Sequence, residues 1–142
     1  MWNVQWDTGD GKLPSEETLV SYVVRELAHE KDLHGKKVLV TAGPTQEAID
    51  PVRYITNHST GKMGYALAEA AMLRGAEVTL ISGPTAIEPP MFVNVIPIIS
   101  AQEMFEKVAT NATENDIIIK AAAVADYRPK EVCDEKIKKS DH

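Results

Sequence analysis

The chain has 142 residues, of which 44% are hydrophobic and 25% are charged, and its formal net charge at pH 7 is −6. This length allows one hydrophobic core, and the composition is that of an ordinary globular domain. The negative charge argues against broad nucleic-acid binding, which needs a basic surface, but backbone N–H groups and a few cations can still hold a small anion.

Neither a membrane anchor nor a cysteine framework is expected. The longest apolar runs, residues 117–119 and 121–125, are far shorter than the roughly 20 residues of a transmembrane helix, and the N-terminus has no signal-peptide pattern. The single cysteine, Cys133, excludes an internal disulfide, and the four histidines do not have the spacing of zinc ligands. We therefore expect a cytoplasmic protein without membrane or nucleic-acid partners.

Hydrophobic periodicity predicts alternating helices and strands. The first 14 residues lack a sustained period and indicate an irregular lead-in, followed by an amphipathic helix from Ser15 to Lys31 that ends near Gly35. The further predicted elements are a strand over 37–42, a helix over 63–74, strands over 77–82 and 92–98, a helix from a Ser100 cap to Ala112, and a strand over 116–123. This order predicts an α/β fold, Rossmann-like and doubly wound, with a mainly parallel sheet and helices on both faces.

The helix over 63–74 has one apolar side in this interpretation. Its expected members are Met63, Ala66, Leu67, Ala70, Ala71 and Leu73.

The long link from Gly43 to Thr60, between the first strand and its helix, is the most informative segment. Links of this length inside a compact fold are usually functional. The dinucleotide fingerprint G-x-G-x-x-G is missing here, and a P-loop would need glycine at Thr56 and serine or threonine at Met63.

A phosphate cradle is predicted where this link enters the helix. Ser59, Thr60, Gly61 and Gly64 lie at the predicted N-terminus, where unpaired N–H groups and the positive dipole end favour an anion. The alternative is that Ser59 or Thr60 only caps the helix.

Arg53 and Asn57 lie four residues apart in the same link. A permanent cation beside an amide suits a phosphate next to a carbonyl group. The alternative is a surface ion pair between Arg53 and Asp50, with Asn57 stabilising a turn.

Further candidates follow the last predicted strand. Ala121, Ala122 and Ala123 leave room for a ligand to approach the backbone, and Asp126 could bind a metal or a sugar hydroxyl, or simply begin a turn. The lysine run KIKK at 136–139 is usually a solvated face.

The tripeptide Gly-Pro-Thr occurs at 43–45 and again at 83–85, each time directly after a predicted strand. Both copies should therefore leave the carboxyl edge of the sheet, where open α/β sheets bind ligands. For the second copy, an ordinary Gly-Pro turn is an equally good explanation.

Three segments together resemble phosphopantothenoylcysteine synthetase, which in bacteria is usually the C-terminal part of a bifunctional coenzyme A biosynthesis protein. They are GPTQEAIDPVRYITNHSTGKMG at 43–64, KAAAVADYRP at 120–129 and KIKK at 136–139. In addition, GDGKLPSEETLV is similar to the tail of the preceding flavin-dependent decarboxylase domain. The resemblance implies a lead-in and linker helix over 1–34 and about the first half of the synthetase domain over 35–142, ending in a flap segment.

The reaction that this resemblance implies is a two-step ligation. CTP activates the carboxylate of 4'-phosphopantothenate as an acyl-cytidylate and releases pyrophosphate, and the amine of L-cysteine then displaces CMP to give 4'-phosphopantothenoylcysteine. The resemblance also implies Mg²⁺ and a homodimer formed through the synthetase domain, with FMN only in the absent decarboxylase domain.

The resemblance implies a catalytic role for Asn57 at the acyl-cytidylate, with Arg53 assisting and Lys136 on a flap that neutralises phosphate charge. Contacts to CTP or phosphopantothenate are expected from Gly43, Pro44, Thr45, Ser59, Thr60, Gly61, Lys62, Met63, Gly64, Ala121, Ala122, Ala123, Asp126 and Lys138, and Asp126 would also face Mg²⁺. The alternative function is a nucleotide-binding or dimerisation fragment without independent activity. An NAD-type oxidoreductase is disfavoured because the dinucleotide fingerprint is missing.

Overall fold

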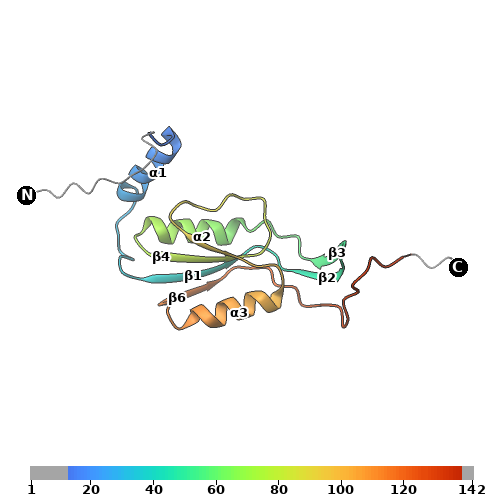
Figure 1. Ribbon diagram of the computed structural model, residues 1–142. Coiled ribbons are helices and arrows are strands. Elements are labelled where there is room, and N and C mark those ends of the chain that lie inside the picture. Colours follow the sequence, from blue (N-terminus) through green and yellow to red (C-terminus); the bar gives the residue numbers. More distant parts are fainter. Residues whose placement is uncertain (1–12, 139–142) are drawn as a thin grey trace, which may run out of the picture.

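The computed structural model describes residues 13–138, so most of the predicted irregular lead-in, and Lys139 of the KIKK run, lie outside the described residues. Its elements in chain order are α1 (Glu16–Leu27), β1 (Lys37–Ala42), β2 (Gln46–Asp50), β3 (Arg53–Thr56), α2 (Lys62–Leu73), β4 (Glu77–Ser82), β5 (Asn94–Pro97), α3 (Ala101–Ala112) and β6 (Ile117–Lys120) (Figure 1).

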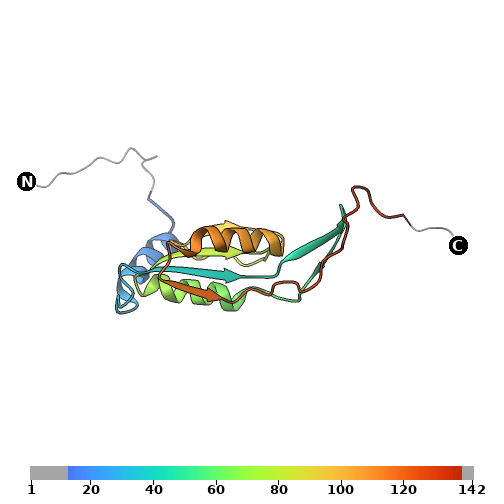
Figure 2. The ribbon, with the colours of Figure 1, turned by 90° about the horizontal axis from the view of Figure 1, so that it is seen from below.

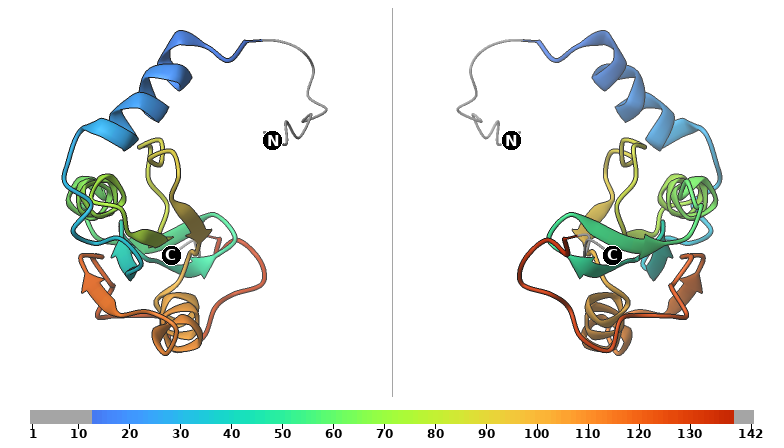
Figure 3. Two further views of the ribbon diagram at one scale, coloured as in Figure 1. Left: turned by 90° about the vertical axis from the view of Figure 1, so that its left-hand side faces the viewer. Right: turned by 90° about the vertical axis from the view of Figure 1, so that its right-hand side faces the viewer.

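Four of the strands form one parallel sheet in the order β5-β4-β1-β6. Helices α2 and α3 cover opposite faces of this sheet (Figures 2 and 3). Successive residues of β1 point to the two faces, so that Val38 and Val40 pack below α2 while Leu39 packs with Met104 of α3. The predicted α/β, Rossmann-like fold with a parallel sheet and helices on both faces is confirmed.

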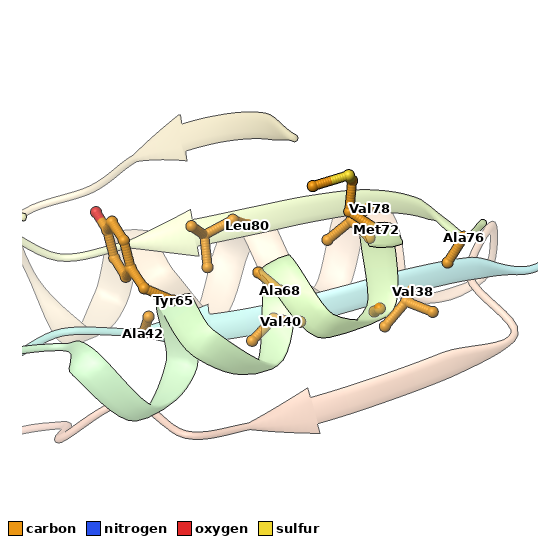
Figure 4. Packing of buried hydrophobic residues seen from close by; sticks show 10 residues of the cluster. Val38, Val40, Ala42, Tyr65, Ala68, Met72, Ala76, Val78 and Leu80 are labelled. Atoms are coloured by element: carbon orange, nitrogen blue, oxygen red, sulfur yellow. The ribbon is translucent and has the colours of Figure 1, made fainter. Parts of the chain in front are cut away.

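Small side chains let α2 lie close to the sheet (Figure 4). The buried residues of α2 are Gly64, Tyr65, Ala68, Ala71 and Met72. The predicted apolar side was therefore partly wrong: Met63 is 72% exposed and Ala66 and Ala70 also face solvent. Alanine occurs on every side of this helix, so hydrophobic periodicity alone cannot select the buried face.

Several elements are shorter than the sequence predicted. The first helix stops at Leu27, and the strand predicted over 92–98 begins only at Asn94. Phe92 has a φ of 67°, a left-handed conformation that is incompatible with an extended strand. The last strand ends at Lys120, and beyond it Ala123 forms an isolated parallel bridge with Pro44.

The link from Gly43 to Thr60 is more regular than the sequence predicted. It contains β2 and β3, which pair antiparallel as a hairpin separate from the main sheet, with an irregular register between Ala48 and Asp50. The hairpin projects beyond the carboxyl edge of the main sheet, and the C-terminal segment runs beside it (Figures 1 and 2). Its strands are short and partly polar, which gives little hydrophobic signal in the sequence.

Helix α1 packs loosely, because none of its residues is buried. Phe92 contacts two of its side chains: its ring meets that of Tyr22 edge to face at a centroid distance of 4.8 Å and lies under the guanidinium of Arg25 at 4.6 Å. Within residues 13–138, no helix is both long and apolar enough to cross a membrane. The proposed boundary between residues 34 and 35 stays a prediction.

Substituting Gly64→Ala should lower the free energy of unfolding by about 1–3 kcal/mol, because a Cβ at this position would overlap that of Ala42 and lie 3.1 Å from the carbonyl oxygen of Thr41. The matched change Ala66→Gly, at an exposed position of the same helix, should also destabilise, by about 0.5–1 kcal/mol, through lost helix propensity. Urea denaturation measures both. Stabilisation by Gly64→Ala would contradict the close contact between α2 and β1.

Candidate functional site

Three glycines meet at the carboxyl edge of the sheet, one after β1, one after β4 and one before α2. A Cβ added to Gly43 would lie 3.1 Å from the carbonyl oxygen of Gly83, and one added to Gly83 would overlap the carbonyl of Pro44. A Cβ on Gly61 would lie 3.4 Å from the Cα of Gly43. The two Gly-Pro-Thr segments thus contact each other through their backbones directly after β1 and β4. The second copy therefore also has a packing role that an ordinary turn would not need.

The N-terminus of α2 opens beside these glycines. Its N-cap residue is Gly61, with a φ of 77°, and no side chain caps the helix. The hydroxyl of Ser59 accepts a bond from the Gly61 N–H at 3.3 Å, and the carbonyl of Thr60 accepts one from the hydroxyl of Thr85 at 2.8 Å. The alternative in which Ser59 or Thr60 caps the helix is therefore wrong.

The first turn of α2 has the chemistry of an anion site. It consists of Lys62, Met63 and Gly64 and contains no acidic residue. The unpaired N–H groups of a first helical turn carry partial positive charge, and the exposed Lys62 adds a full one. The start of α2 is thus an uncapped helix N-terminus beside glycine backbone, and its use as a phosphate cradle stays a prediction.

Thr45 links the segment that follows β1 to the segment that follows β6. It is fully buried, its N–H donates to the carbonyl of Ala123 at 3.2 Å, and its hydroxyl accepts from the N–H of Ala125 at 2.8 Å. Its own carbonyl accepts a bond from the hydroxyl of Thr56 at 2.7 Å. The side chain of Thr45 therefore supports the site and does not face solvent.

Asn57 lies beside the same segment. Its amide nitrogen donates to the carbonyls of Ala123 at 3.3 Å and of Val124 at 3.1 Å. Both partners are acceptors, so the amide nitrogen must be the atom that faces them. The side-chain oxygen is then the atom of Asn57 with remaining capacity to bind a ligand.

The predicted alanine floor follows directly from β6. The N–H of Ala121 donates to Thr41 at 3.1 Å, and that of Ala123 donates to Gly43 at 2.9 Å. Ala121, Ala122 and Ala123 are all partly exposed, and Asp126 is exposed just beyond them. The structure thus brings Gly43, Asn57 and these alanines together at one edge.

Arg53 lies elsewhere, at the far end of β3. Four residues of extended chain, roughly 13 Å, separate it from Asn57. Its guanidinium binds Asp50 through Nε at 2.9 Å and through Nη2, so the alternative of an ion pair with Asp50 is confirmed. The hydrogen bonds from Arg53 hold the pKa of the Asp50 carboxyl well below its usual range, and the same contact raises the pKa of Arg53.

The segment with the predicted flap lysines lies along the hairpin. The N–H of Cys133 donates to the carbonyl of Ile49 at 3.0 Å, and the backbone of Ile137 contacts Asp50 and Arg53. Lys136 and Lys138, on either side of Ile137, are both exposed.

Within residues 13–138, no group of three or more His, Cys, Asp or Glu side chains could by itself hold a metal ion. Asp126 alone would supply one carboxylate. Magnesium is commonly held by one or two carboxylates together with the phosphates of a substrate. A single carboxylate fits that mode of binding, and the assignment of Asp126 to Mg²⁺ stays a prediction.

Sequence reasoning missed one polar contact that fixes the hairpin. The carboxylate of Glu47 is buried and accepts the N–H of Ala101 at 2.7 Å, at the start of α3. In the same place Gln46 donates its N–H to the carbonyl of Ile99 at 2.7 Å. No motif marks Glu47, because its partner is 54 residues away.

Comparison with known proteins places this geometry in a family. Residues 33–142 match the family described as DNA/pantothenate metabolism flavoprotein C-terminal domain. The chain belongs to this family.

Curated relatives and solved structures agree with this assignment. The coenzyme A biosynthesis bifunctional protein CoaBC of Vibrio vulnificus is 53% identical over 135 residues, which are 95% of this chain and 33% of that protein. CoaBC of Bacillus subtilis is 52% identical over 136 residues, 94% of this chain and 34% of that protein. The crystal structure of the C-terminal domain of a CoaBC protein superposes with a TM-score of 0.67 and 59% identity, covering 70% of this chain and 50% of that one. The chain thus spans about a third of the length of its curated relatives.

In this flavoprotein C-terminal domain, Thr45→Val should destabilise the fold by about 1–3 kcal/mol, because the N–H of Ala125 loses its acceptor while the side-chain volume is kept. Thr45→Ser retains the hydroxyl and is the matched control. Thermal unfolding compares the two variants. A larger loss of stability in Thr45→Ser than in Thr45→Val would mean that the methyl group, and not the hydrogen bond, is the important part of Thr45.

Proposed function

We propose that this chain is the nucleotide-handling portion of a cytoplasmic phosphopantothenate–cysteine ligase of coenzyme A biosynthesis. The proposed reaction joins 4'-phosphopantothenate to L-cysteine at the expense of CTP, through an acyl-cytidylate, and gives 4'-phosphopantothenoylcysteine, CMP and pyrophosphate. The observation that carries the proposal is the uncapped N-terminus of α2, walled by glycine backbone, next to Asn57 and Ala121–Ala123. Family membership and the similarity to coenzyme A biosynthesis proteins support the pathway.

The phosphates of CTP would lie against the first turn of α2. Glycine at positions 43, 61 and 83 allows backbone atoms to approach closely, so that the N–H groups of residues 62–64 can point at phosphate oxygens. Lys62 would add a flexible cation. These contacts bind and orient the nucleotide without a dinucleotide fingerprint or a P-loop.

Asn57 would act in the second step, on the amine that attacks the acyl-cytidylate, and not on the acyl-cytidylate itself as the resemblance implies. Two hydrogen bonds to backbone carbonyls fix the plane of its amide, which leaves Oδ1 as an oriented acceptor. An acceptor suits the attacking amine of L-cysteine better than a developing negative charge. In this role Asn57 would orient the amine toward the acyl-cytidylate formed in the first step.

Charge neutralisation would come from Lys136 and Lys138 on the segment beside the hairpin. Magnesium would accompany the CTP phosphates, with Asp126 as the candidate protein ligand. When bound, the metal would screen phosphate charge during release of pyrophosphate.

The proposed homodimer rests on the family resemblance. The projecting hairpin exposes Val52, Tyr54 and Ile55, whose exposed fractions are 57%, 53% and 39%. Apolar side chains on a projecting element would suit contact with a second copy.

The second candidate function is a nucleotide-binding or dimerisation fragment without independent turnover. The coverage of only about a third of each curated relative favours keeping this alternative. Pyrophosphate release with 4'-phosphopantothenate and CTP separates the two candidates.

Titration calorimetry of the chain with CTP and Mg²⁺, and separately with ATP and Mg²⁺, tests the nucleotide site. We expect saturable binding with selectivity for CTP, because only the CTP-dependent reaction follows from the proposed function. The absence of heat with a chain that circular dichroism shows to be folded would contradict a complete nucleotide site.

Substitution Lys62→Gln should weaken CTP binding about tenfold, a loss of about 1.4 kcal/mol, because one phosphate contact loses its charge. The control is Lys107→Gln, which removes the same charge from an exposed position of α3, away from the cradle. Equal weakening by both variants would indicate a general charge effect and would contradict the placement of phosphate at α2.

A further inference from the structure

A buried carboxylate holds the hairpin end together. The side chain of Asp50 has an exposed fraction of 0%. Its Oδ1 accepts the N–H groups of Val52 and Arg53, both at 2.9 Å, which closes the turn between β2 and β3. Its Oδ2 accepts Arg53 Nε at 2.9 Å, Arg53 Nη2, and the N–H of Ile137 at 3.1 Å.

The side chains of Asp50 and Arg53 together bind both the backbone N–H and the backbone C=O of Ile137. While Asp50 accepts the N–H of Ile137, Arg53 Nη2 donates to the carbonyl of Ile137 at 3.0 Å. Eighty-seven residues separate Asp50 from Ile137, so this contact is purely tertiary. A second tie lies four residues earlier, where the N–H of Cys133 donates to the carbonyl of Ile49.

We propose that Asp50 is a positioning residue, which acts through Arg53 and the backbone of Ile137 to set where Lys136 and Lys138 lie. Fixing the N–H and the C=O of one residue fixes the direction of the chain on both sides of it. The two exposed lysines are the immediate neighbours of that residue. We call the contacts of Asp50 and Arg53 with the backbone of Ile137 the clamp. The ligand assigned to the two lysines rests on the proposed function, whereas the clamp does not.

This arrangement also assigns a different task to Arg53 from the one that the resemblance implied. Two of its nitrogens are engaged with Asp50 and Ile137, at the far end of β3 from Asn57. The planar fork of arginine can bind a carboxylate and a carbonyl at once, which a lysine ammonium on a flexible stem does less well. Arg53 is therefore a positioning residue as well, and Lys136 and Lys138 remain the groups that would meet phosphate.

The clamp can be tested with a spin label, because the chain has one cysteine, and Cys133 is exposed on the clamped segment. A nitroxide on Cys133 reports the mobility of this segment in the electron paramagnetic resonance line shape. Asp50→Asn and Arg53→Lys should both sharpen the spectrum at a temperature at which circular dichroism shows each variant to be folded. Asp50→Asn places an NH₂ group where Oδ2 or Oδ1 accepts hydrogen bonds, and Arg53→Lys keeps the charge but removes the fork.

Each variant has a matched control. Asp116→Asn alters a carboxylate that accepts one backbone N–H, that of Lys37 at 2.8 Å, at the opposite end of the sheet. Arg74→Lys alters an arginine that likewise binds a carboxylate through two nitrogens, with Asp32 as its partner. Neither control should change the spectrum of the label. A label that stays as immobile in Asp50→Asn as in the parent chain, or that is released equally by the controls, would overturn the proposal.

If Asp50→Asn does not fold, Ile137→Pro provides the second variant, because it removes the N–H that Asp50 accepts and lies on an exposed segment, where the fixed φ of proline is tolerated. It should release the label in the same way, and an unchanged spectrum would again overturn the clamp.

A binding measurement links the clamp to the lysines. Lys136→Gln and Asp50→Asn should each weaken Mg²⁺–CTP binding several-fold, and the double variant should be no weaker than the weaker single variant, since both act through the same contact. Additive losses would show that Asp50 acts independently of Lys136 and would refute the positioning role. If the parent chain binds no CTP, the proposed function fails, while the spin-label experiment still decides on the clamp.

Discussion

The backbones that leave β1 and β4 touch each other without any intervening side chain, and this contact determines how close the start of α2 lies to the ends of both strands. Gly83 rests against the carbonyl of Pro44, and Gly61 lies against Gly43 from the side of α2. Any side chain at position 83 would push the two strand exits apart. Parallel pairing of β1 with β4 brings the exits to the same edge, and glycine lets them close on the start of α2.

Polar contacts, and not a second hydrophobic core, attach the hairpin to this edge. Thr45, Glu47 and Asp50 are buried, and each binds backbone groups of a different distant segment. The irregular register between Ala48 and Asp50 brings Asp50, two residues before Val52, to the inside. Within the part of the chain that the structure describes, no buried side-chain nitrogen or oxygen lacks a hydrogen-bond partner. A hairpin held in this way can project beyond the sheet and still keep a defined position.

The residues that stabilise the fold and the residues that could bind a ligand lie in different parts of the structure. The apolar clusters beneath α2 and α3 lie along the length of the sheet, whereas the exposed groups with binding capacity lie at its carboxyl edge and along the hairpin. Core substitutions should therefore act mainly on unfolding. Changes at Asn57, Lys62 and Lys136 should act mainly on binding, because these side chains are exposed.

The sequence by itself determined the succession of parallel strands and helices along the chain and a glycine-rich start of the helix that follows residue 60. Buried parallel strands such as 37–42 and 77–82 are continuous β-branched runs, and a glycine-rich entry to a helix is a local pattern. It did not determine the buried face of α2, the hairpin within 43–60, or the partners of Glu47 and Asp50. Those depend on contacts such as Asp50 with Ile137, between residues far apart in the chain, and no local period or spacing encodes them. Arg53 illustrates the difference: its side-chain chemistry is readable from the sequence, but only the tertiary structure decided that its guanidinium holds the C-terminal segment at the far end of β3 from Asn57.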